Sequence, residues 1–593
     1  MAKGLGRRLA ALFIAVTLLL CGCSPTTAQN AGTDDDSLTM NTWRSYNDFH
    51  KLLAETRPDL PLSLISYTGC NQTGYSWAQM QADDIPDFFI TSQILDEELA
   101  AERLVDLSAY PFINRFSTSI LDQVAIDGGV YLLPVNSVMY GIYYNKTLME
   151  EHGWTLPNNF AELETLCERI REAGLIPGVI GTQLTGNTFS TVFNLAKTSW
   201  LTTPAGLNWE RSFLNGEASA EGTWEDTMDY VQKYIDIGMF QTDPEDRGNP
   251  TIILDYLGSR KAVFATAVLA VSITELPETG DQLGLMPFIS EDGSKNIYMY
   301  SPSSYIGISK RLTEPGNEKK LEQAIEVLSL LFSEEGQDAF INEQTPCISS
   351  VLDHSDVGAD SMIFDAQQAF QEGRAFPMTY AHWEDILAGI GQSYKDWFRG
   401  ENGMDGPKCI AAMDKQKQDA LKQADQLYFC ESTADFTLQE TAKLIAKAVG
   451  SGLGADAVMI PLGGYHENGS ELYSGVTGKL YQGKINLDVV SAISPYTNGD
   501  FLIMEMTGAD ANTLVQEGFD AYGDGMPFEY LLVTKGDIML KDDTKYRIAF
   551  LPEGYTEQTA AAHPTETVTH SLTDFLHRWL EQQETVSPDG NPW

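Results

Sequence analysis

Basic side chains are scarce in this sequence, which has 38 lysines and arginines against 83 aspartates and glutamates. The formal net charge at pH 7 is −45. Proteins that bind nucleic acids need basic patches to displace counterions from the phosphates, so no nucleic-acid partner is expected. The acidity itself favours solubility and disfavours adhesion to anionic surfaces.

Long hydrophobic runs are missing after the first twenty residues, so no later membrane-spanning helix is expected. Residues 9–20 form an apolar run behind Arg7 and Arg8, as in a signal peptide. The run ends in Leu-Cys-Gly-Cys, which resembles a bacterial lipobox and implies cleavage before Cys23, with a lipid on its sulfur. We therefore expect a signal peptide over 1–22, a lipidated flexible tether over 23–37 and a membrane anchor. The alternative is a plain secretory signal with a chance cysteine.

Cysteine pairs with metal-binding spacing are absent as well. The chain has 7 cysteines, and the five that follow the leader include no C-x-x-C spacing. Neither a zinc site nor a disulfide scaffold is supported, although one or two disulfides stay open. We expect most of these thiols to be buried and unpaired: Cys70, Cys167, Cys347, Cys409 and Cys430.

Catalytic signatures are missing too. The sequence contains no G-x-x-x-x-G-K-[ST] phosphate loop, no G-x-S-x-G elbow and no H-E-x-x-H. Acidic pairs are common in so acidic a chain and therefore do not indicate a glycosidase. These absences favour a binding protein over an enzyme.

What the sequence does contain, over residues 38–426, is short β-rich runs alternating with amphipathic helical stretches. Runs at 63–67, 87–91 and 261–271 predict strands, and the apolar spacing over 318–333 predicts a surface helix. Alternating strands and helices indicate α/β layers with mostly parallel strands. Because the segment is too long for one core, two lobes are expected.

Four motifs stand out in this segment: MQADDIPDFFITSQ from Met80, GVYLLPVNSVMYGIYYNK from Gly129, SRKAVFATA from Ser259 and SPSSYIGISK from Ser301. In order and spacing they resemble the extracellular solute-binding proteins of carbohydrate ABC importers. The resemblance implies a two-lobed clamp of the periplasmic binding protein type, which takes up a sugar-like solute without metal or cofactor. It also implies ABC permease subunits as partners.

Sugars have an apolar C–H face and a rim of hydroxyl groups, so aromatic rings and amides are the expected liners of such a site. Residues at the carboxyl ends of strands are favoured, because α/β sheets bind ligands there. The candidate ligand-binding residues of the clamp are Trp43, Thr91, Gln93, Asn136, Tyr140, Asn187, Trp200, Tyr380 and Trp383.

The chain continues with an extension over 431–593 that has its own helices and strands. LQETAKLIAKAV, the turn at Gly463-Gly464, SPYTNGD and the closing SLTDFLHRWL resemble the C-terminal domain of 5′-nucleotidases. The resemblance implies a smaller α/β domain. Its candidate ligand-binding residues are Tyr465, Tyr496, Asn498 and Tyr555.

Hydrolysis by this extension is not expected. Two-metal hydrolysis needs clustered His, Asp and Asn ligands, and the sequence has only 8 histidines. His50 follows Asn-Asp-Phe like a metal-domain box, yet Phe49 and Leu53 indicate an amphipathic helix there. A solute receptor with a non-catalytic extension is therefore favoured, and the alternative is a cell-surface 5′-nucleotidase or nucleotide-binding protein.

Overall fold

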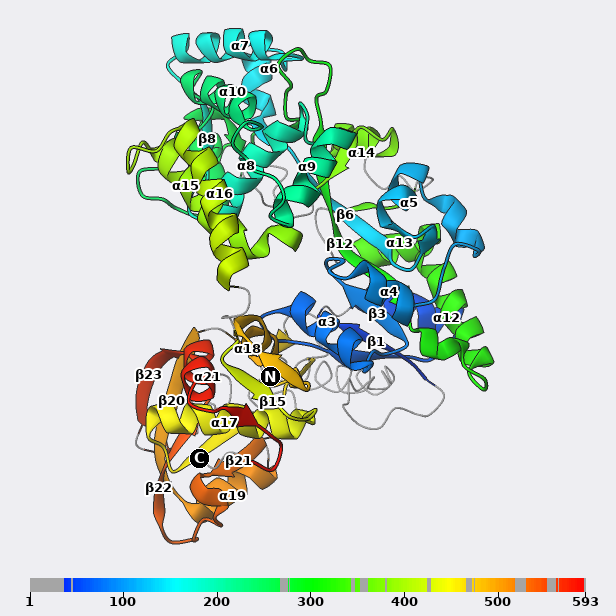
Figure 1. The fold of residues 1–593 in the computed structure, drawn as a ribbon, viewed down its shortest axis with the longest axis vertical. Helices are drawn as coiled ribbons and strands as arrows, with labels where there is room; N and C mark the ends of the chain where they lie inside the picture. Colours follow the sequence, from blue (N-terminus) through cyan, green and yellow to red (C-terminus); the bar gives the residue numbers. More distant parts are fainter. Residues whose placement is uncertain are drawn as a thin grey trace, which may run out of the picture.

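The computed structural model describes residues 37–43, 46–266, 276, 278–342, 347–351, 361–378, 381–423, 428–465, 472–473, 475–496, 498–517, 530–551, 562–563, 565–590 and 593. The predicted signal peptide and Cys23 lie outside these residues, as do Tyr380 and Tyr555. Within the described part of the chain, no helix is long and apolar enough to cross a membrane. The chain forms two lobes and an extension, at the right, top and lower left of Figure 1.

Lobe 1 is built on a mixed sheet with the strand order β13–β6–β12–β3–β1–β2, and β14 pairs with β12. Helices pack against this sheet, as Figure 1 shows for α4, α12 and α13. The strands are β1 (Leu38–Thr42), β2 (Leu62–Ser66), β3 (Phe88–Thr91), β6 (Leu133–Tyr140), β12 (Tyr298–Ile308), β13 (Cys347–Ser349) and β14 (Ala375–Pro377). The helices are α2 (Asn47–Thr56), α3 (Gln72–Ala82), α4 (Glu97–Arg103), α5 (Thr118–Val124), α12 (Glu318–Leu331), α13 (Glu334–Asn342) and α14 (Phe364–Gln371).

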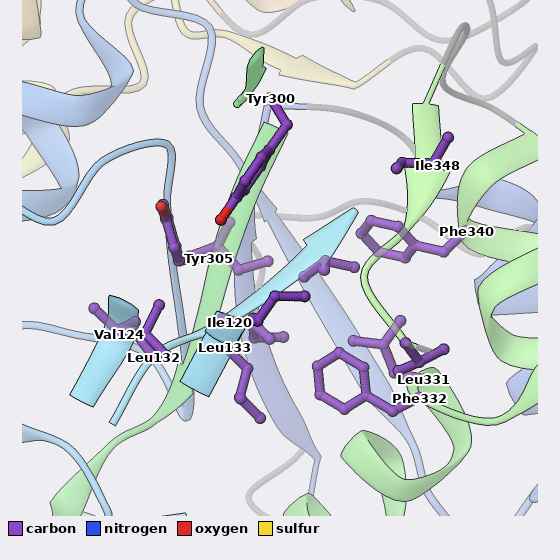
Figure 2. Close-up of a cluster of buried hydrophobic side chains, with 14 of the residues drawn as sticks. Ile120, Val124, Leu132, Leu133, Tyr300, Tyr305, Leu331, Phe332, Phe340 and Ile348 are labelled. Atoms are coloured by element: carbon purple, nitrogen blue, oxygen red, sulfur yellow. The ribbon is translucent and has the colours of Figure 1, made fainter. Parts of the chain in front are cut away.

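The core of lobe 1 forms where the apolar stripes of its helices meet the sheet. Figure 2 shows part of it, with Leu133 of β6 among Ile120 of α5, Leu331 of α12 and Phe332. These four side chains are at most 5% exposed. Burial of aliphatic and aromatic side chains on this scale is the main force that holds such a layer together.

Lobe 2 is built on a second mixed sheet with the order β11–β7–β10–β8–β9. Its core is rich in aromatic rings, including Phe193, Phe213 and Trp224, which are at most 1% exposed. The strands are β7 (Ile142–Asn145), β8 (Ile176–Ile180), β9 (Gln241–Thr242), β10 (Ala262–Thr266) and β11 (Leu283–Met286). The helices are α6 (Lys146–Glu151), α7 (Phe160–Glu172), α8 (Thr185–Lys197), α9 (Pro204–Leu214), α10 (Glu225–Asp236), α11 (Asn249–Ile252), α15 (Glu384–Arg399) and α16 (Gly406–Gln423).

The expectation of mostly parallel strands was wrong. Parallel pairs occur in both lobes, with β1–β2 at one end of the sheet of lobe 1 and β8–β10 inside that of lobe 2. However, β12 runs antiparallel to β3 and β6, and β7 antiparallel to β10 and β11. The chain passes between the lobes along β6–β7 and β11–β12. A strand that arrives from the other lobe enters its new sheet in the reverse direction, which accounts for the mixture.

The extension is a three-layered α/β unit around a sheet of order β21–β16–β22–β20–β23. Alternate residues of β16 face two separate cores: Val458 packs with α17 and α21, and Met459 packs on the side of α19. A capping box between Thr437 and Glu440 begins α17. The elements are β15 (Cys430–Ser432), α17 (Leu438–Leu453), β16 (Ala457–Pro461), β17 (Gly464–Tyr465), β18 (Leu472–Tyr473), β19 (Gly483–Ile485), α18 (Leu487–Ile493), β20 (Asn498–Thr507), α19 (Gly508–Glu517), β21 (Tyr530–Thr534), β22 (Lys545–Phe550), β23 (Thr565–Ser571), α21 (Leu572–Leu580) and β24 (Thr585–Val586).

The cysteines fit the expectation of buried thiols in most cases. Cys167, Cys409 and Cys430 are buried free thiols, Cys347 is buried as well, and Cys70 is exposed. Burial raises the pKa of Cys167 and of Cys409 to about 12, so both stay protonated and unreactive at neutral pH.

Candidate functional site

The chain passes from the sheet of lobe 1 to the sheet of lobe 2 along β6 and β7. β1, β2 and β3 run parallel, so Trp43, Tyr67 and Gln93 follow strands that end at one edge of lobe 1. β6 runs on past this edge: Asn136 pairs with Ser304 next to the end of β3, and Tyr140 pairs with Met299 farther along β12. β7 begins at Ile142, which pairs with Thr266 at the end of β10. The stretch of β6 from Asn136 to Gly141 therefore connects the carboxyl edge of lobe 1 to that of lobe 2, and α/β proteins bind ligands at such edges.

Position 141, between β6 and β7, requires a glycine because the backbone of β11 passes close to it. A Cβ atom on it would collide with the carbonyl oxygen of Met286 on β11, and a backbone atom cannot move aside cheaply. The absence of a side chain lets β7 and β11 pair directly after the crossing. The junction between the two edges is thereby held at a fixed place.

At the edge of lobe 1, the Gln93 backbone is held by two donors. Its carbonyl oxygen accepts a hydrogen bond from the Thr91 hydroxyl at 2.9 Å and another from the Trp77 indole N–H at 2.9 Å. The side-chain Oε1 of Gln93 is buried without a hydrogen-bond partner among the described residues. Thr91 itself is fully buried, so it positions Gln93 and does not line the edge.

Gln72 lies at the neighbouring loop, as the first residue of α3. Asn71 caps this helix by accepting a hydrogen bond from the Gly74 amide at 2.8 Å. The hydroxyl groups of Thr73 and Ser92 are hydrogen-bonded and tie this loop to the one after β3. The Nε2 of Gln72 is buried and, in the described part of the chain, has no acceptor. The edge of lobe 1 thus has an unused amide donor and an unused amide acceptor.

A β-bulge brings a third such group to the same edge. The register of β12 against β6 shifts between Pro302 and Ser304 and again between Ser304 and Tyr305. Because Tyr305 pairs with Thr91 at the end of β3, Ser304 lies just beyond that end. Its hydroxyl belongs to a side chain that is 1% exposed and has no partner within the described residues. Bulges commonly re-aim a side chain next to a functional site.

Lobe 2 uses its amide differently. Asn187, in α8, donates from Nδ2 to the carbonyl oxygens of Gly181 at 2.5 Å and Thr266 at 3.3 Å, so it holds the ends of β8 and β10 together. The Thr266 side chain is 2% exposed, and its hydroxyl has no partner among the described residues. We conclude that Asn187 supports the edge of lobe 2, where Thr266 presents the unused polar group.

The three tryptophans that the sequence suggested as liners lie in or against the lobe cores. Trp383 is 1% exposed, packs its ring at 4.6 Å from that of Phe193, and donates its N–H to Glu210 at 2.8 Å. Trp200 is half-buried and donates to the Thr227 hydroxyl at 2.9 Å. Trp43 packs against the core of lobe 1 at the end of β1. Trp383 has no ring face left for a solute and is removed from the candidate set.

Two further candidates lie along β6. Tyr140, at the crossing, is partly exposed, and burial of its ring raises the pKa of its hydroxyl to about 12, so the group is a neutral donor and acceptor at physiological pH. Asn136 is fully buried, and its Oδ1 accepts a hydrogen bond from the Ser303 hydroxyl. Asn136 therefore fixes the bulge of β12.

Among the candidates in the extension, Tyr465 belongs to β17 and Asn498 begins β20. Tyr496 packs against the core under α17 and α21, with its ring 6.2 Å from that of Phe501. His50 lies in α2, and its Nε2 is hydrogen-bonded to the carbonyl oxygen of Leu62 at 2.8 Å, so it has a structural role. Across the described ranges, no group of three or more His, Cys, Asp or Glu side chains could hold a metal ion.

Sequence reasoning missed Gln72, Thr266 and Ser304. Gln72 comes after a predicted strand, as Gln93 does, so the rule that found Gln93 could have found it. Thr266 lies inside the predicted run 261–271, so that rule does not mark it, although β10 ends at this residue. Ser304 carries no such signal, because a bulge depends on how two strands pair.

Comparison with known proteins finds one family whose model matches part of both lobes. Residues 78–338, which contribute to both lobes, match the family described as bacterial extracellular solute-binding protein. Among proteins of curated function, no sequence matches the chain.

Solved structures of solute-binding proteins share the fold of the lobes. A putative binding protein MsmE from Bacillus subtilis, in an open conformation, has a TM-score of 0.53 at 14% identity, covering 67% of this chain and 100% of its own. The bacterial solute receptor AcbH has a TM-score of 0.53 at 12% identity, covering 65% and 99%. The apo form of RafE from Streptococcus pneumoniae has a TM-score of 0.50 at 16% identity, covering 65% and 99%.

Proposed function

We propose that this protein is a lipid-anchored extracellular receptor that captures a neutral carbohydrate between its two lobes and delivers it to an ABC importer. The proposal rests most heavily on one observation: the carboxyl edges of the two sheets, which the end of β6 connects, contain buried, uncharged polar groups without partners among the described residues. They are Gln72 Nε2, Gln93 Oε1, Ser304 Oγ and Thr266 Oγ1.

These groups match the chemistry of a sugar. A buried donor or acceptor that stays unsatisfied costs about 1–3 kcal/mol. Each sugar hydroxyl donates one hydrogen bond and accepts others, so it can serve the amide donor of Gln72 and the amide acceptor of Gln93 together. Neutral partners suffice for all four groups, which favours a sugar over a charged solute. The receptor AcbH has an exclusive preference for β-D-galactopyranose, which supports the same solute class here.

Closure would follow from contacts that exist only when both edges reach the solute. Groups of lobe 1 (Gln72 and Gln93) and of lobe 2 (Thr266) can bind one molecule together only if the lobes approach, so the solute shifts the population toward a closed form. Small-angle scattering of the protein with and without β-D-galactopyranose or raffinose tests this. A smaller radius of gyration with a sugar supports the proposal. An unchanged radius at saturating, calorimetrically confirmed binding contradicts it.

The anchor and the permease partners belong to the same proposal. The family is extracellular, and the Leu-Cys-Gly-Cys box at residues 20–23 supports a lipid on Cys23. Replacing Cys23 with Ser should move the protein from the membrane fraction to the soluble fraction. A variant that stays with the membrane would exclude the lipid anchor.

For the extension we propose a non-catalytic domain of the 5′-nucleotidase C-terminal type. Support comes from the order of its motifs and from its α/β layers around β16. The described residues hold no cluster of metal ligands that could activate a water for attack on a phosphate ester. Release of phosphate from AMP by the purified protein with Mg²⁺, Mn²⁺ or Zn²⁺ would overturn this part of the proposal.

A further inference from the structure

The loop between β2 and α3 of lobe 1 is bound by the extension through its backbone. The Thr68 amide donates to the Thr477 hydroxyl at 2.8 Å, and the Cys70 amide donates to the Ser494 carbonyl oxygen at 2.9 Å. The Thr68 hydroxyl donates to the carbonyl oxygen of Gly475 at 3.0 Å. Two backbone donors of this loop therefore depend on acceptors that lie in a different, distant part of the chain.

Aromatic rings close the same interface. Tyr67 and Tyr75 stack with ring centroids 4.5 Å apart, and Tyr481 of the extension stacks on Tyr75 at 6.3 Å. The buried Tyr67 hydroxyl donates to the carbonyl oxygen of Ala492 in α18 at 2.8 Å. Burial of the ring raises the pKa of Tyr75 to about 12, so this hydroxyl stays neutral. The three rings with Ala492 form a small separate core between lobe 1 and the extension.

Asp84, just beyond the end of α3, adds a charged clamp at the rim of this core. Its Oδ2 accepts a hydrogen bond from the Tyr481 hydroxyl at 2.8 Å and lies 2.7 Å from the Lys479 ammonium. Figure 1 shows the result, with α18 of the extension beside α3 of lobe 1. The contacts thus run from the start of α3 to its end.

The bound loop leads directly to the candidate site. Asn71, next to Cys70, caps α3, and Gln72 and Thr73 begin the helix. The Thr73 hydroxyl is bonded to that of Ser92, beside Gln93. A continuous chain of hydrogen bonds and backbone therefore connects Thr477 of the extension to the unused amides at the edge of lobe 1.

We infer that the extension is a fixed part of lobe 1 and that Thr477 is a positioning residue for the solute site, because it orders the loop that presents Gln72. This rests on the proposed function for the identity of the site, while the ordering of the loop stands on its own contacts. The extension gives the loop after β2 the acceptors that the loops of lobe 1 do not supply. It also travels with lobe 1 when the lobes move, although the chain enters it from α16 of lobe 2.

The test replaces Thr477 in the full chain. Thr477→Val keeps the shape but removes the acceptor of the Thr68 amide, and Thr477→Ser restores it. Thr513→Val is the matched control, because the Thr513 hydroxyl donates within α19 to the carbonyl oxygen of Ala509 at 2.9 Å, away from the loop after β2. Hydrogen exchange is followed at the amides of Thr68 and, beyond the direct contact, of Gly74 and Tyr75, which both report on the Asn71 cap.

The inference predicts exchange about five- to tenfold faster at Thr68, Gly74 and Tyr75 in Thr477→Val, with wild-type rates in Thr477→Ser and Thr513→Val. Affinity for β-D-galactopyranose or raffinose, whichever the wild type binds, should fall about three- to tenfold only in the Val variant. Unchanged exchange at Gly74 and Tyr75 in Thr477→Val would overturn the inference, as would faster exchange there with unchanged sugar affinity. If the wild type binds no neutral sugar, the proposed function fails, and the exchange rates alone decide the inference.

Discussion

The two lobes have the same plan but use their amide side chains in opposite ways. In lobe 2, Asn187 gives its amide hydrogens to backbone carbonyls and joins the ends of β8 and β10. In lobe 1, Gln72 and Gln93 each keep one polar atom unused among the described residues, and backbone and hydroxyl groups hold the loops around them. The comparison teaches that an amide side chain near the carboxyl end of a strand is a candidate for ligand binding only when its polar atoms are not already hydrogen-bonded to the backbone.

The lobes also differ in what stabilises them. Lobe 2 relies on a closely packed aromatic core in which Trp383 touches Phe193 and Phe213. Lobe 1 has a more aliphatic core and is bound by the extension through Tyr67 and Tyr75. Damage to one lobe should therefore appear in different measurements from damage to the other.

The largest effect is expected from Trp383→Ala. The ring is 1% exposed, so its removal leaves a cavity in lobe 2 and should lower the free energy of unfolding by about 3–5 kcal/mol. Denaturant unfolding measures this, and Trp200→Ala, at a half-buried ring, should cost less. A Trp383→Ala variant with wild-type stability and lost sugar affinity would return Trp383 to the binding site.

A smaller effect concerns the pH dependence of lobe 2. Lys197 is buried at the end of α8 and donates to the Pro377 carbonyl oxygen at 2.9 Å. Burial lowers its pKa from 10.5 to about 8. The unfolded chain therefore binds more protons between these values, and stability rises with pH across this window. Below pH 8 the buried amine is charged in the folded protein, so the full free-energy cost of burying that charge lowers the stability.

Lys197→Met removes this titration. The difference in unfolding free energy between wild type and variant should shift by roughly 3 kcal/mol in favour of the wild type from about pH 8 to 10.5. Comparing the two proteins cancels the other groups that titrate in this range. A difference that stays constant with pH would show that Lys197 is not buried as described.

The comparison of amides predicts the next effect. Gln93→Ala should weaken sugar binding about tenfold, because it removes an acceptor at the edge of lobe 1, with little change in stability. Asn187→Ala should instead lower the stability of lobe 2 by about 1–3 kcal/mol, because it removes two hydrogen bonds to buried carbonyl oxygens. Calorimetric titration and thermal unfolding of both variants separate the two roles. If Gln93→Ala lowered the stability and Asn187→Ala weakened sugar binding, the two roles would have to be reversed.

The sequence predicted the elements well where periodicity was strong. The run at 318–333 became α12, the runs at 63–67 and 87–91 became β2 and β3, and LQETAKLIAKAV lies in α17. It also placed Gln93 shortly after a strand, as the end of β3 at Thr91 confirms, while the role of Gln93 as a ligand stays a prediction. These successes depend on local pattern alone, which burial on one face of a helix or sheet enforces.

What failed depended on contacts between distant segments. Tryptophan and asparagine are residue types that sugars prefer. Trp383, however, packs in the core of lobe 2, and Asn187 bonds the backbone at the ends of β8 and β10. Antiparallel pairing of β12 could not be predicted without the path of the chain between lobes. The binding of Thr68 by Thr477 links positions that no local pattern connects.

The most direct test of the central claim is calorimetric titration of the full chain with paired solutes. Neutral sugars, β-D-galactopyranose and raffinose among them, are compared with charged counterparts such as galacturonate and with amino acids and peptides. The account predicts saturable one-to-one binding of at least one neutral sugar and much weaker binding of its charged counterpart. Tight binding of a charged solute or a peptide, with no response to any neutral sugar, would contradict it.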